Sequence, residues 1–354
     1  MVKSGLYEVT SCFALTEPSE RLSDFNAFPA NVWAAIRSGG LGGRVLFITG
    51  ASGFAGSWVL AAITRLNSRL AKPLTVRALT RTPRESAEPW LTWVHGDVRD
   101  FRDDVHADLL LHAALPSVAT PAGGDAELRD TATRGMENVV AHSHRVGVSR
   151  SVVLSSGAVY GRATGPVSES MPLGEADPSD AYGTAKREVE AIAQAGAGAN
   201  LDVVIARLFT CLGPGYRSHA HLAHVSLLQD ARAGRTLTLR SDGKAVRSYL
   251  YGADLAVWLL AVLGGSGSDV VNVGSDLPMT VYAFAQRVAR LSGRGHDPIV
   301  TGPERESRRP YFVPDIARAR AKYLLAPWTT VELAISRSLA TEWFAGNTSV
   351  PSQS

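Results

Sequence analysis

The sequence predicts an α/β fold, a doubly wound parallel sheet with helices on both faces. Two observations carry this prediction. From Arg44 onward, short apolar runs alternate with longer segments whose apolar residues recur at helical spacing, which is the pattern of consecutive strand–helix–strand units. The first apolar run, 44–49, is followed directly by a glycine turn and then a helix-like segment, the order that a phosphate-binding loop requires.

The elements follow in order from these two periodicities. The predicted strands, short apolar runs, are 44–49, 74–79, 91–95, 108–113, 151–156 and 202–207, with later ones near 246–251 and 269–273. The predicted helices are 54–66, 125–146, 180–195, 220–233, 252–263 and 279–292, with a short one near 30–37 after Pro29. Connections between parallel strands are right-handed, which places the ligand crevice at the carboxyl ends of the strands.

Composition and charge exclude several classes of protein. With 354 residues and 45% apolar content the chain can bury a large core. A formal charge of +3 gives no argument for nucleic acid. No apolar run reaches the about 18 residues of a membrane span, and the first residues lack the apolar core of a secretory signal. Two cysteines, Cys12 and Cys211, make no disulfide framework, so the expected location is the cytoplasm.

The glycine turn has the spacing Gly-x-x-Gly-x-x-Gly. Glycines allow the backbone to turn tightly and to approach a diphosphate, while the start of the following helix offers free N–H groups and a positive dipole end. The turn therefore predicts binding of a dinucleotide through Gly50, Ser52, Gly53, Phe54 and Gly56.

Residues after the next strands are candidates for the rest of the cofactor. An acid that would bind the adenosine ribose is missing after the second strand, where Arg81 stands instead; an arginine suits a 2′-phosphate, which favours NADP over NAD. Asp97 either hydrogen-bonds the adenine edge or is a turn residue, with Val98 beside it. Small residues after the fourth strand allow close approach of the cofactor; these are Ala113 and Ala114, followed by Leu115.

Tyr182 and Lys186 are the predicted acid/base pair. Their spacing of four places both side chains on one face of a helix. A free tyrosine has a pKa near ~10, and a nearby ammonium is expected to lower it, so that the phenol can exchange a proton with a sugar or alcohol hydroxyl. Ser156, at the end of the fifth strand, can donate a hydrogen bond to the substrate oxygen during this transfer.

With these motifs on the page, the chain resembles the extended short-chain dehydrogenase/reductase family, in particular its nucleotide-sugar epimerases and dehydratases. The resemblance covers roughly residues 44–340. It rests on Gly50-x-x-Gly53-x-x-Gly56, Ser155–Gly161, Tyr182-x-x-x-Lys186, Arg207–Pro214, Arg247–Asp254 and Val271–Gly274, which occur in the family's order. It implies a Rossmann-like doubly wound parallel sheet that holds NAD or NADP, with a smaller C-terminal substrate-binding lobe for a nucleoside-diphosphate sugar.

The resemblance also implies boundaries and roles. The expected parts are the NAD(P)-binding unit, 40–212, to which 246–273 returns; the substrate lobe, 213–245 and 274–345; and a tail, 346–354. The residues before them, 1–39, are read from the chain itself as an N-terminal extension, for which surface packing is favoured over a lid or a dimer contact. By the same likeness Lys186 binds the nicotinamide ribose, Ser156 orients the sugar, and Arg247 binds the diphosphate. Thr210 replaces the family's asparagine at another substrate contact. A homodimer, and a role in polysaccharide biosynthesis, are further expectations from the resemblance.

Departures from the family narrow the reaction. The family's 4,6-dehydratases have an acidic pair after the catalytic hydroxyl residue, and its decarboxylases tend to have an acid there; this chain has Gly157 and Ala158. Epimerisation at C4 needs only Ser156, Tyr182 and Lys186. Reduction of a keto sugar by NADPH needs the same three residues, so both reactions stay open.

Other readings of the sequence also stay open. The same scaffold is also used by three other kinds of protein: an unusual dehydratase, a non-catalytic NAD(P)-binding sensor, and a dehydrogenase of steroids or small carbonyls.

The sequence contains a histidine cluster, His219, His221 and His224. It lacks an acid or cysteine to complete a metal site, so no metal is expected, and these histidines are predicted to border the substrate cleft.

Overall fold

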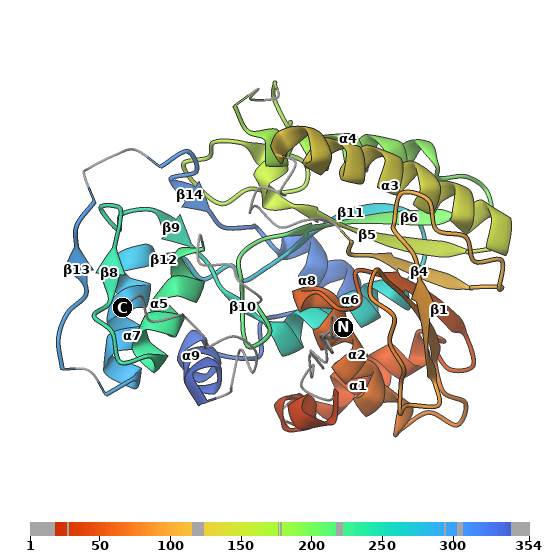
Figure 1. Ribbon diagram of the computed structural model, residues 1–354, viewed down its shortest axis with the longest axis horizontal. Coiled ribbons are helices and arrows are strands. Elements are labelled where there is room, and N and C mark those ends of the chain that lie inside the picture. Colours follow the sequence, from red (N-terminus) through yellow and green to blue (C-terminus); the bar gives the residue numbers. More distant parts are fainter. Residues whose placement is uncertain are drawn as a thin grey trace, which may run out of the picture.

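The computed structural model describes residues 18–26, 28–114, 124–175, 177, 179–216, 222–293, 295–302 and 307–340. The predicted tail lies outside these ranges. Within them, a large parallel sheet lies between two layers of helices, and a smaller group of short strands and helices, formed mainly after residue 212, lies at one end (Figure 1).

The main sheet has seven strands in the order β11-β6-β5-β4-β1-β2-β3, and every neighbouring pair is parallel. Its strands are β1 (Val45–Thr49), β2 (Thr75–Thr80), β3 (Leu91–His95), β4 (Leu109–His112), β5 (Arg150–Ser156), β6 (Asp202–Leu208) and β11 (Asp269–Val273). The winding direction reverses between β1 and β4, which opens a crevice at the carboxyl ends of these two strands. The predicted doubly wound parallel sheet is confirmed.

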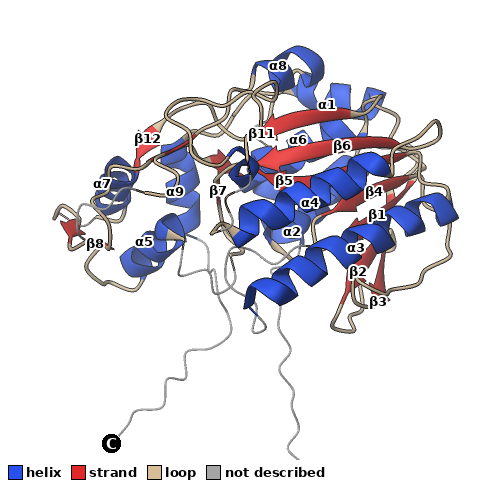
Figure 2. Ribbon diagram, turned by 90° about the horizontal axis from the view of Figure 1, so that it is seen from above, coloured by secondary structure: helices blue, strands red, loops and turns tan. Residues whose placement is uncertain are grey.

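Helices cover both faces of this sheet. On one face lie α2 (Phe54–Asn67) and α6 (Gly252–Leu263), which pack against each other; on the other lie α3 (Gly124–Val146) and α4 (Ala181–Ala195) (Figure 2). Each face has its own apolar core, since side chains alternate along a strand: Leu46 and Ile48 belong to one core and Phe47 to the other. Across the described ranges, no helix is both long and apolar enough to cross a lipid bilayer.

The smaller group contains the remaining short elements. These are β7 (Cys211–Leu212), β8 (Thr238–Leu239), β9 (Val246–Arg247), β10 (Leu250–Tyr251), β12 (Met279–Thr280), β13 (Ile299–Val300), β14 (Tyr311–Phe312), α5 (Ala223–Arg232), α7 (Val281–Leu291) and α9 (Val331–Ala340). Helix α8 (Ala317–Tyr323) is the exception, because it packs against β11 at the edge of the main sheet. The single strand predicted near 246–251 is wrong. It consists of β9, which pairs with β12 and β14, and β10, which pairs with β7, because the chain crosses here from one small sheet to another.

The N-terminal extension is more than a surface segment. It forms a 3₁₀ helix, Pro18–Phe25, and the predicted helix α1 (Ala30–Ser38). Phe25 and Trp33 are almost completely buried. The ring of Phe25 packs edge to face against Trp33 and against Trp58 of α2. The expectation of surface packing is therefore wrong, because these aromatic rings belong to the main apolar core.

Candidate active site

The glycine turn between β1 and α2 leaves no room for side chains. Gly50 has a φ of +71°, and a Cβ atom there would lie 2.5 Å from the Ala113 carbonyl and 2.6 Å from the Ala114 nitrogen. A Cβ atom on Gly56 would lie 2.4 Å from the Gly50 oxygen. The turn, the start of α2 and the segment after β4 therefore meet backbone to backbone, which forms a shallow cradle at the strand ends.

The start of α2 fits an anionic group. Gly53 is the N-cap residue, no side chain caps this end of the helix, and its first turn contains no acid. The N–H groups of this turn and the positive end of the helix dipole therefore suit the diphosphate of a dinucleotide. Ser52 and Phe54 are half-buried beside this end, and Phe54 stacks on Tyr216 with the ring centres 4.0 Å apart.

The residues after β2 and β3 lie at the adenosine end of the predicted cofactor site. The Arg81 side chain is exposed. Asp97 accepts hydrogen bonds from the Arg99 side chain at 2.9 and 3.1 Å and from its backbone N–H at 3.0 Å, which holds the pKa of Asp97 below its usual value. Val98 is buried against α3. Asp97 is thus engaged as a turn residue, while its contact with adenine stays a prediction.

His112, the last residue of β4, is buried between the cofactor turn and the acid/base helix. Its Nδ1 atom lies 2.8 Å from the Thr49 hydroxyl, and Thr49 also accepts a hydrogen bond from the Ala114 N–H at 3.3 Å. Burial, and then the charge of Lys186, lower the pKa of His112 to about 3. The neutral ring therefore keeps Thr49 and the backbone after β4 in place. Leu115 lies outside the described residues.

Ser156, Tyr182 and Lys186 come together at the carboxyl end of β5. The Tyr182 hydroxyl shares a hydrogen bond with the Ser156 side chain, which also accepts from the Ala158 N–H at 3.1 Å. The Lys186 ammonium donates to the Leu154 carbonyl at 2.7 Å and lies 5.8 Å from the centre of the Tyr182 ring. The structure thus brings the three predicted catalytic side chains to the same end of β5, where Tyr182 and Ser156 share a hydrogen bond and Lys186 is bonded to a backbone carbonyl instead.

Burial dominates the acidity of this group. Desolvation raises the pKa of Tyr182, against the lowering effects of the Ser156 hydrogen bond and the Arg309 charge. Burial also lowers the pKa of Lys186 to about 7, partly offset by the carboxylate of Glu190. The expected lowering of the Tyr182 pKa by Lys186 is therefore not observed in this arrangement, because the lysine donates to a carbonyl and its charge is itself suppressed.

A buried network of hydrogen bonds joins α4 to strands β5 and β6. Glu190 lies one turn after Lys186; it accepts from the Ser155 hydroxyl at 2.5 Å and from Arg207 at 2.7 and 3.0 Å. Arg207 also donates to the Tyr160 hydroxyl at 2.9 Å, which donates in turn to Asn272 at 2.8 Å. Sequence reasoning missed this network, although a glutamate four residues after a catalytic lysine signals a charged contact on the same helix face.

The predicted diphosphate arginine lies on β9, in the smaller group of elements. Arg247 is half-buried; it donates to the Val246 and Arg309 carbonyls, both at 2.8 Å, and its guanidinium lies 5.9 Å from the centre of the Phe312 ring. Burial lowers its pKa from the usual value for arginine, which leaves it a cation at neutral pH. Thr210 is half-buried, and its carbonyl accepts from the Leu250 N–H at 3.0 Å.

Arg309 was not among the predicted site residues. Its guanidinium donates to the carboxylate of Asp180, the N-cap residue of α4. Arg308, whose side chain is 55% exposed, lies 3.9 Å from the other oxygen of the same carboxylate. A segment far along the chain therefore contacts the start of the helix that carries Tyr182.

A side chain at the position after Ser156 would force the ring of Phe209 to move. A Cβ atom on Gly157 would lie 2.6 Å from two ring carbons of Phe209. Ala158, the next residue, is 3% exposed. An acid at position 157 would therefore displace the Phe209 ring, and an acid at position 158 would be buried.

The predicted histidine cluster is described only in part. His219 and His221 lie outside the described residues. His224 is buried on α5, where it meets the rings of Tyr216 and Tyr249 edge to face. Among the residues that the structure does describe, no group of three or more histidine, cysteine or acidic side chains could hold a metal ion.

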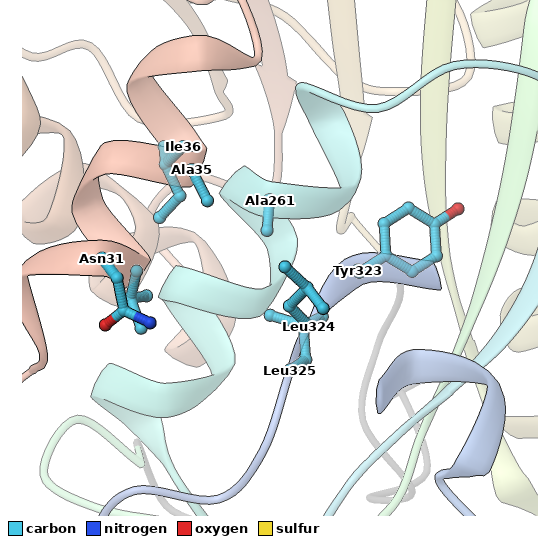
Figure 3. Close-up of a pocket in the computed structure, with 8 residues that line it drawn as sticks. Asn31, Ala35, Ile36, Ala261, Tyr323, Leu324 and Leu325 are labelled. Carbon is cyan, nitrogen blue, oxygen red and sulfur yellow. The ribbon is translucent and has the colours of Figure 1, made fainter. Parts of the chain in front are cut away.

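One small pocket lies away from this site. It has a volume of about 40 Å³ and lies between α1, α6 and the end of α8 (Figure 3). Ala261, near the carboxyl end of α6, is part of its lining. That end of the helix lies at the amino edge of the sheet, where Arg150 donates to the Val262 carbonyl at 2.9 Å. The pocket is therefore opposite the strand ends that carry the catalytic residues and has room for only a few water molecules.

The chain is similar to known proteins in both sequence and fold. The model of the NAD dependent epimerase/dehydratase family matches residues 46–274. The low-salt glycan biosynthesis protein Agl12 of Haloferax volcanii is 26% identical over 290 residues, which are 78% of this chain and 91% of the relative. The dTDP-glucose 4,6-dehydratase of Streptomyces niveus is 25% identical over 256 residues, 72% of this chain and 71% of the relative. The solved structure of MoeE5 in complex with UDP-glucuronic acid and NAD has a TM-score of 0.73 at 24% identity and covers 84% of this chain and 98% of that one.

Proposed function

The chain belongs to the NAD dependent epimerase/dehydratase family, and from this premise we propose that it is a 4-epimerase of a nucleoside-diphosphate sugar. Bound NAD supplies the redox chemistry, which is to accept a hydride from a sugar carbon and to return it. The cradle at Gly50 and Gly53 and the uncapped start of α2 support binding of its diphosphate.

The acid/base step belongs to this chain's own side chains. Tyr182 takes the proton of the sugar hydroxyl as the carbon is oxidised and returns it on reduction. Ser156, already bonded to the Tyr182 hydroxyl, holds the sugar oxygen and stabilises the charge that develops on it. Lys186 has a pKa of about 7, so it can gain or lose a proton near neutral pH as the charge of the site changes.

The observation that carries the choice of epimerase is the packing at Gly157. Elimination of water from an oxidised sugar needs an acid and a base beside the ring. The two positions after Ser156 hold no titratable group, and a side chain at the first of them would collide with the ring of Phe209 as it now lies. The dehydratase reading is therefore disfavoured, and reversible oxidation with return of the hydride to the other face needs only the three residues present.

The experiment incubates the enzyme with NAD and either UDP-glucose or UDP-glucuronic acid and follows the sugar by proton NMR. The expected result is conversion to the 4-epimer, with no change of the cofactor at equilibrium. Tyr182→Phe should lower kcat by about 10³-fold or more, since it removes the phenol that exchanges the proton with the sugar hydroxyl, while NAD binding is largely kept. Full turnover by this variant would contradict the mechanism, and release of carbon dioxide or water from the sugar would contradict the epimerase assignment.

A second candidate is a keto-sugar reductase that uses NADPH. It is favoured by one observation, the exposed Arg81 after β2, where an acid for the ribose of NAD is missing. Cofactor released from the denatured enzyme separates the two. Tightly held NAD⁺ supports the epimerase, whereas a protein that arrives without cofactor and binds NADPH better than NADH supports the reductase.

The homodimer and the cytoplasmic location also stay proposals. Light scattering of the purified chain tests the first, and fractionation of cells tests the second.

A non-catalytic sensor would bind NAD but leave every sugar nucleotide unchanged in the NMR experiment.

A further inference from the structure

Arg309 is joined by hydrogen bonds to both halves of the active site. Its backbone carbonyl accepts a hydrogen bond at 2.8 Å from Arg247, the residue that the family resemblance predicts to bind the diphosphate of the substrate. Its side chain donates to Asp180, at the start of α4. A single residue therefore connects the substrate's phosphate end with the helix that carries the acid/base tyrosine.

Asp180 controls how α4 begins. Its carboxylate accepts from the Gly183 N–H at 3.1 Å, which satisfies one of the free N–H groups at the helix start. A Cβ atom on Gly183 would lie 2.5 Å from this carboxylate, so the contact is close. Because α4 starts at Ala181, this capping bond encloses Tyr182 within the first turn. A shift of the Asp180 carboxylate would move or loosen the turn that holds the phenol.

We propose that Arg309 is a positioning residue that transmits occupancy of the diphosphate site at Arg247 to the first turn of α4, and so to Tyr182. The inference rests on the proposed function, because it needs a diphosphate at Arg247. When the phosphate oxygens engage Arg247, the backbone of Arg309 is drawn with it through the 2.8 Å hydrogen bond. The guanidinium then holds Asp180, and with it the helix start, in the arrangement that presents Tyr182 to the sugar.

Charge at the phenol agrees with this role. The charged groups that face Tyr182 are Asp180 and Lys186 on its own helix and Arg309 from the segment before β14, while Ser156 contributes its hydroxyl and Tyr216 a second phenol. Arg309 favours the phenolate and Asp180 opposes it. Pairing of the two therefore balances these effects, and removal of the arginine alone should make the phenol harder to ionise.

The first test is hydrogen exchange of the NAD-loaded enzyme with and without UDP as the diphosphate probe. In the wild type, UDP should slow exchange in residues 181–185 by about 10-fold, since it closes the first turn of α4. Arg309→Met keeps the carbonyl that Arg247 contacts, so UDP should bind with little loss of affinity but no longer protect this turn. Arg309→Lys should restore part of the protection. Arg308→Met is the matched control, with the same charge change in the same segment. Its side chain is 55% exposed and lies 3.9 Å from Asp180, so its loss should reduce the protection far less than the loss of Arg309.

The outcomes separate the inference from the function on which it rests. If UDP binds Arg309→Met and still protects residues 181–185, the inference is wrong and the proposed function stands. If the wild type binds none of UDP, dTDP and GDP, the proposed function is wrong and the inference falls with it. In the pH profile of kcat/KM, Arg309→Met should move the ionisation assigned to Tyr182 to higher pH, and Arg308→Met should leave it in place. A profile of Arg309→Met equal to that of the wild type would also overturn the inference.

Discussion

Two of the acid–arginine pairs that hold helix α4 differ in burial and in what they join. Behind the catalytic residues, Glu190 and Arg207 are almost completely buried, with side chains 5% and 6% exposed. At the start of the helix, Asp180 and Arg309 are 9% and 19% exposed. The first pair joins α4 to β6 of the large sheet, whereas the second joins it to the segment before β14, in the smaller group of elements.

The comparison teaches that the two pairs serve different ends of one helix. A fully buried pair cannot lose one partner without leaving an uncompensated charge in the core. A partly exposed pair can open, because water is available to both groups. Glu190 and Arg207 therefore fix α4 to the sheet, while Asp180 and Arg309 can respond to a ligand.

The largest effect is expected at the buried pair. Glu190→Gln keeps the size of the side chain but removes the charge opposite Arg207, so the free energy of unfolding should fall by about 3–5 kcal/mol. Urea denaturation measures it. Glu188→Gln is the control, on the same helix and paired with Arg129, whose side chain is 70% exposed; it should change stability by about 0.5 kcal/mol or less. Equal losses in the two variants would erase the distinction between buried and exposed pairs.

The next effect concerns Lys186, which lies between the two pairs. Burial lowers its pKa from 10.5 to about 7. Between these values the unfolded chain binds a proton that the native state does not, so Lys186 makes the free energy of unfolding rise with pH, by up to about 1.4 kcal/mol per unit. Below this window both states hold the proton and the contribution becomes constant.

Lys186→Met should remove this dependence. Urea denaturation from about pH 7.5 to about pH 9.5 should show a smaller rise in stability for the variant than for the wild type. The same rise in both proteins would mean that the ammonium keeps its ordinary pKa in the fold. Above this range tyrosines begin to titrate, so the comparison should stop there.

The smallest effect on stability is expected at Asp180. Asp180→Ala removes the cap of α4 and should lower the free energy of unfolding by about 1 kcal/mol, with a clear loss of kcat because the Tyr182 turn loosens. Asp180→Asn restores an acceptor for the Gly183 N–H but not the charge for Arg309. It should regain stability but not kcat. Recovery of both properties by asparagine would show that the cap alone matters.

Most of the sheet and its helices could be predicted because each element has a clear period and a turn or cap at its end. The glycine turn and the acid/base helix were found in the same way, since their residues are close in sequence. The unpredicted features depend on long-range contacts. Arg309 meets Asp180 across 129 positions of the chain, and no local pattern encodes such a pair. The acidity of Tyr182 was misjudged because desolvation depends on the packing around it, which spacing does not reveal.

The prediction of a single strand near 246–251 was wrong for a related reason. Its residues have a β-like composition throughout, but hydrogen-bond partners for β9 and β10 come from different small sheets. Strand length is decided by these partners rather than by propensity.

The buried aromatic rings before β1 bear on where the folding unit begins. The family match starts at residue 46, yet Phe25 and Trp33 fill the core beside Trp58. In a chain shortened to start at the first strand, apolar side chains of α2 and α6 that the N-terminal segment now covers would be exposed to solvent. Exposed apolar surface of this kind promotes aggregation. The folding unit is therefore expected to begin before the segment that the family model matches.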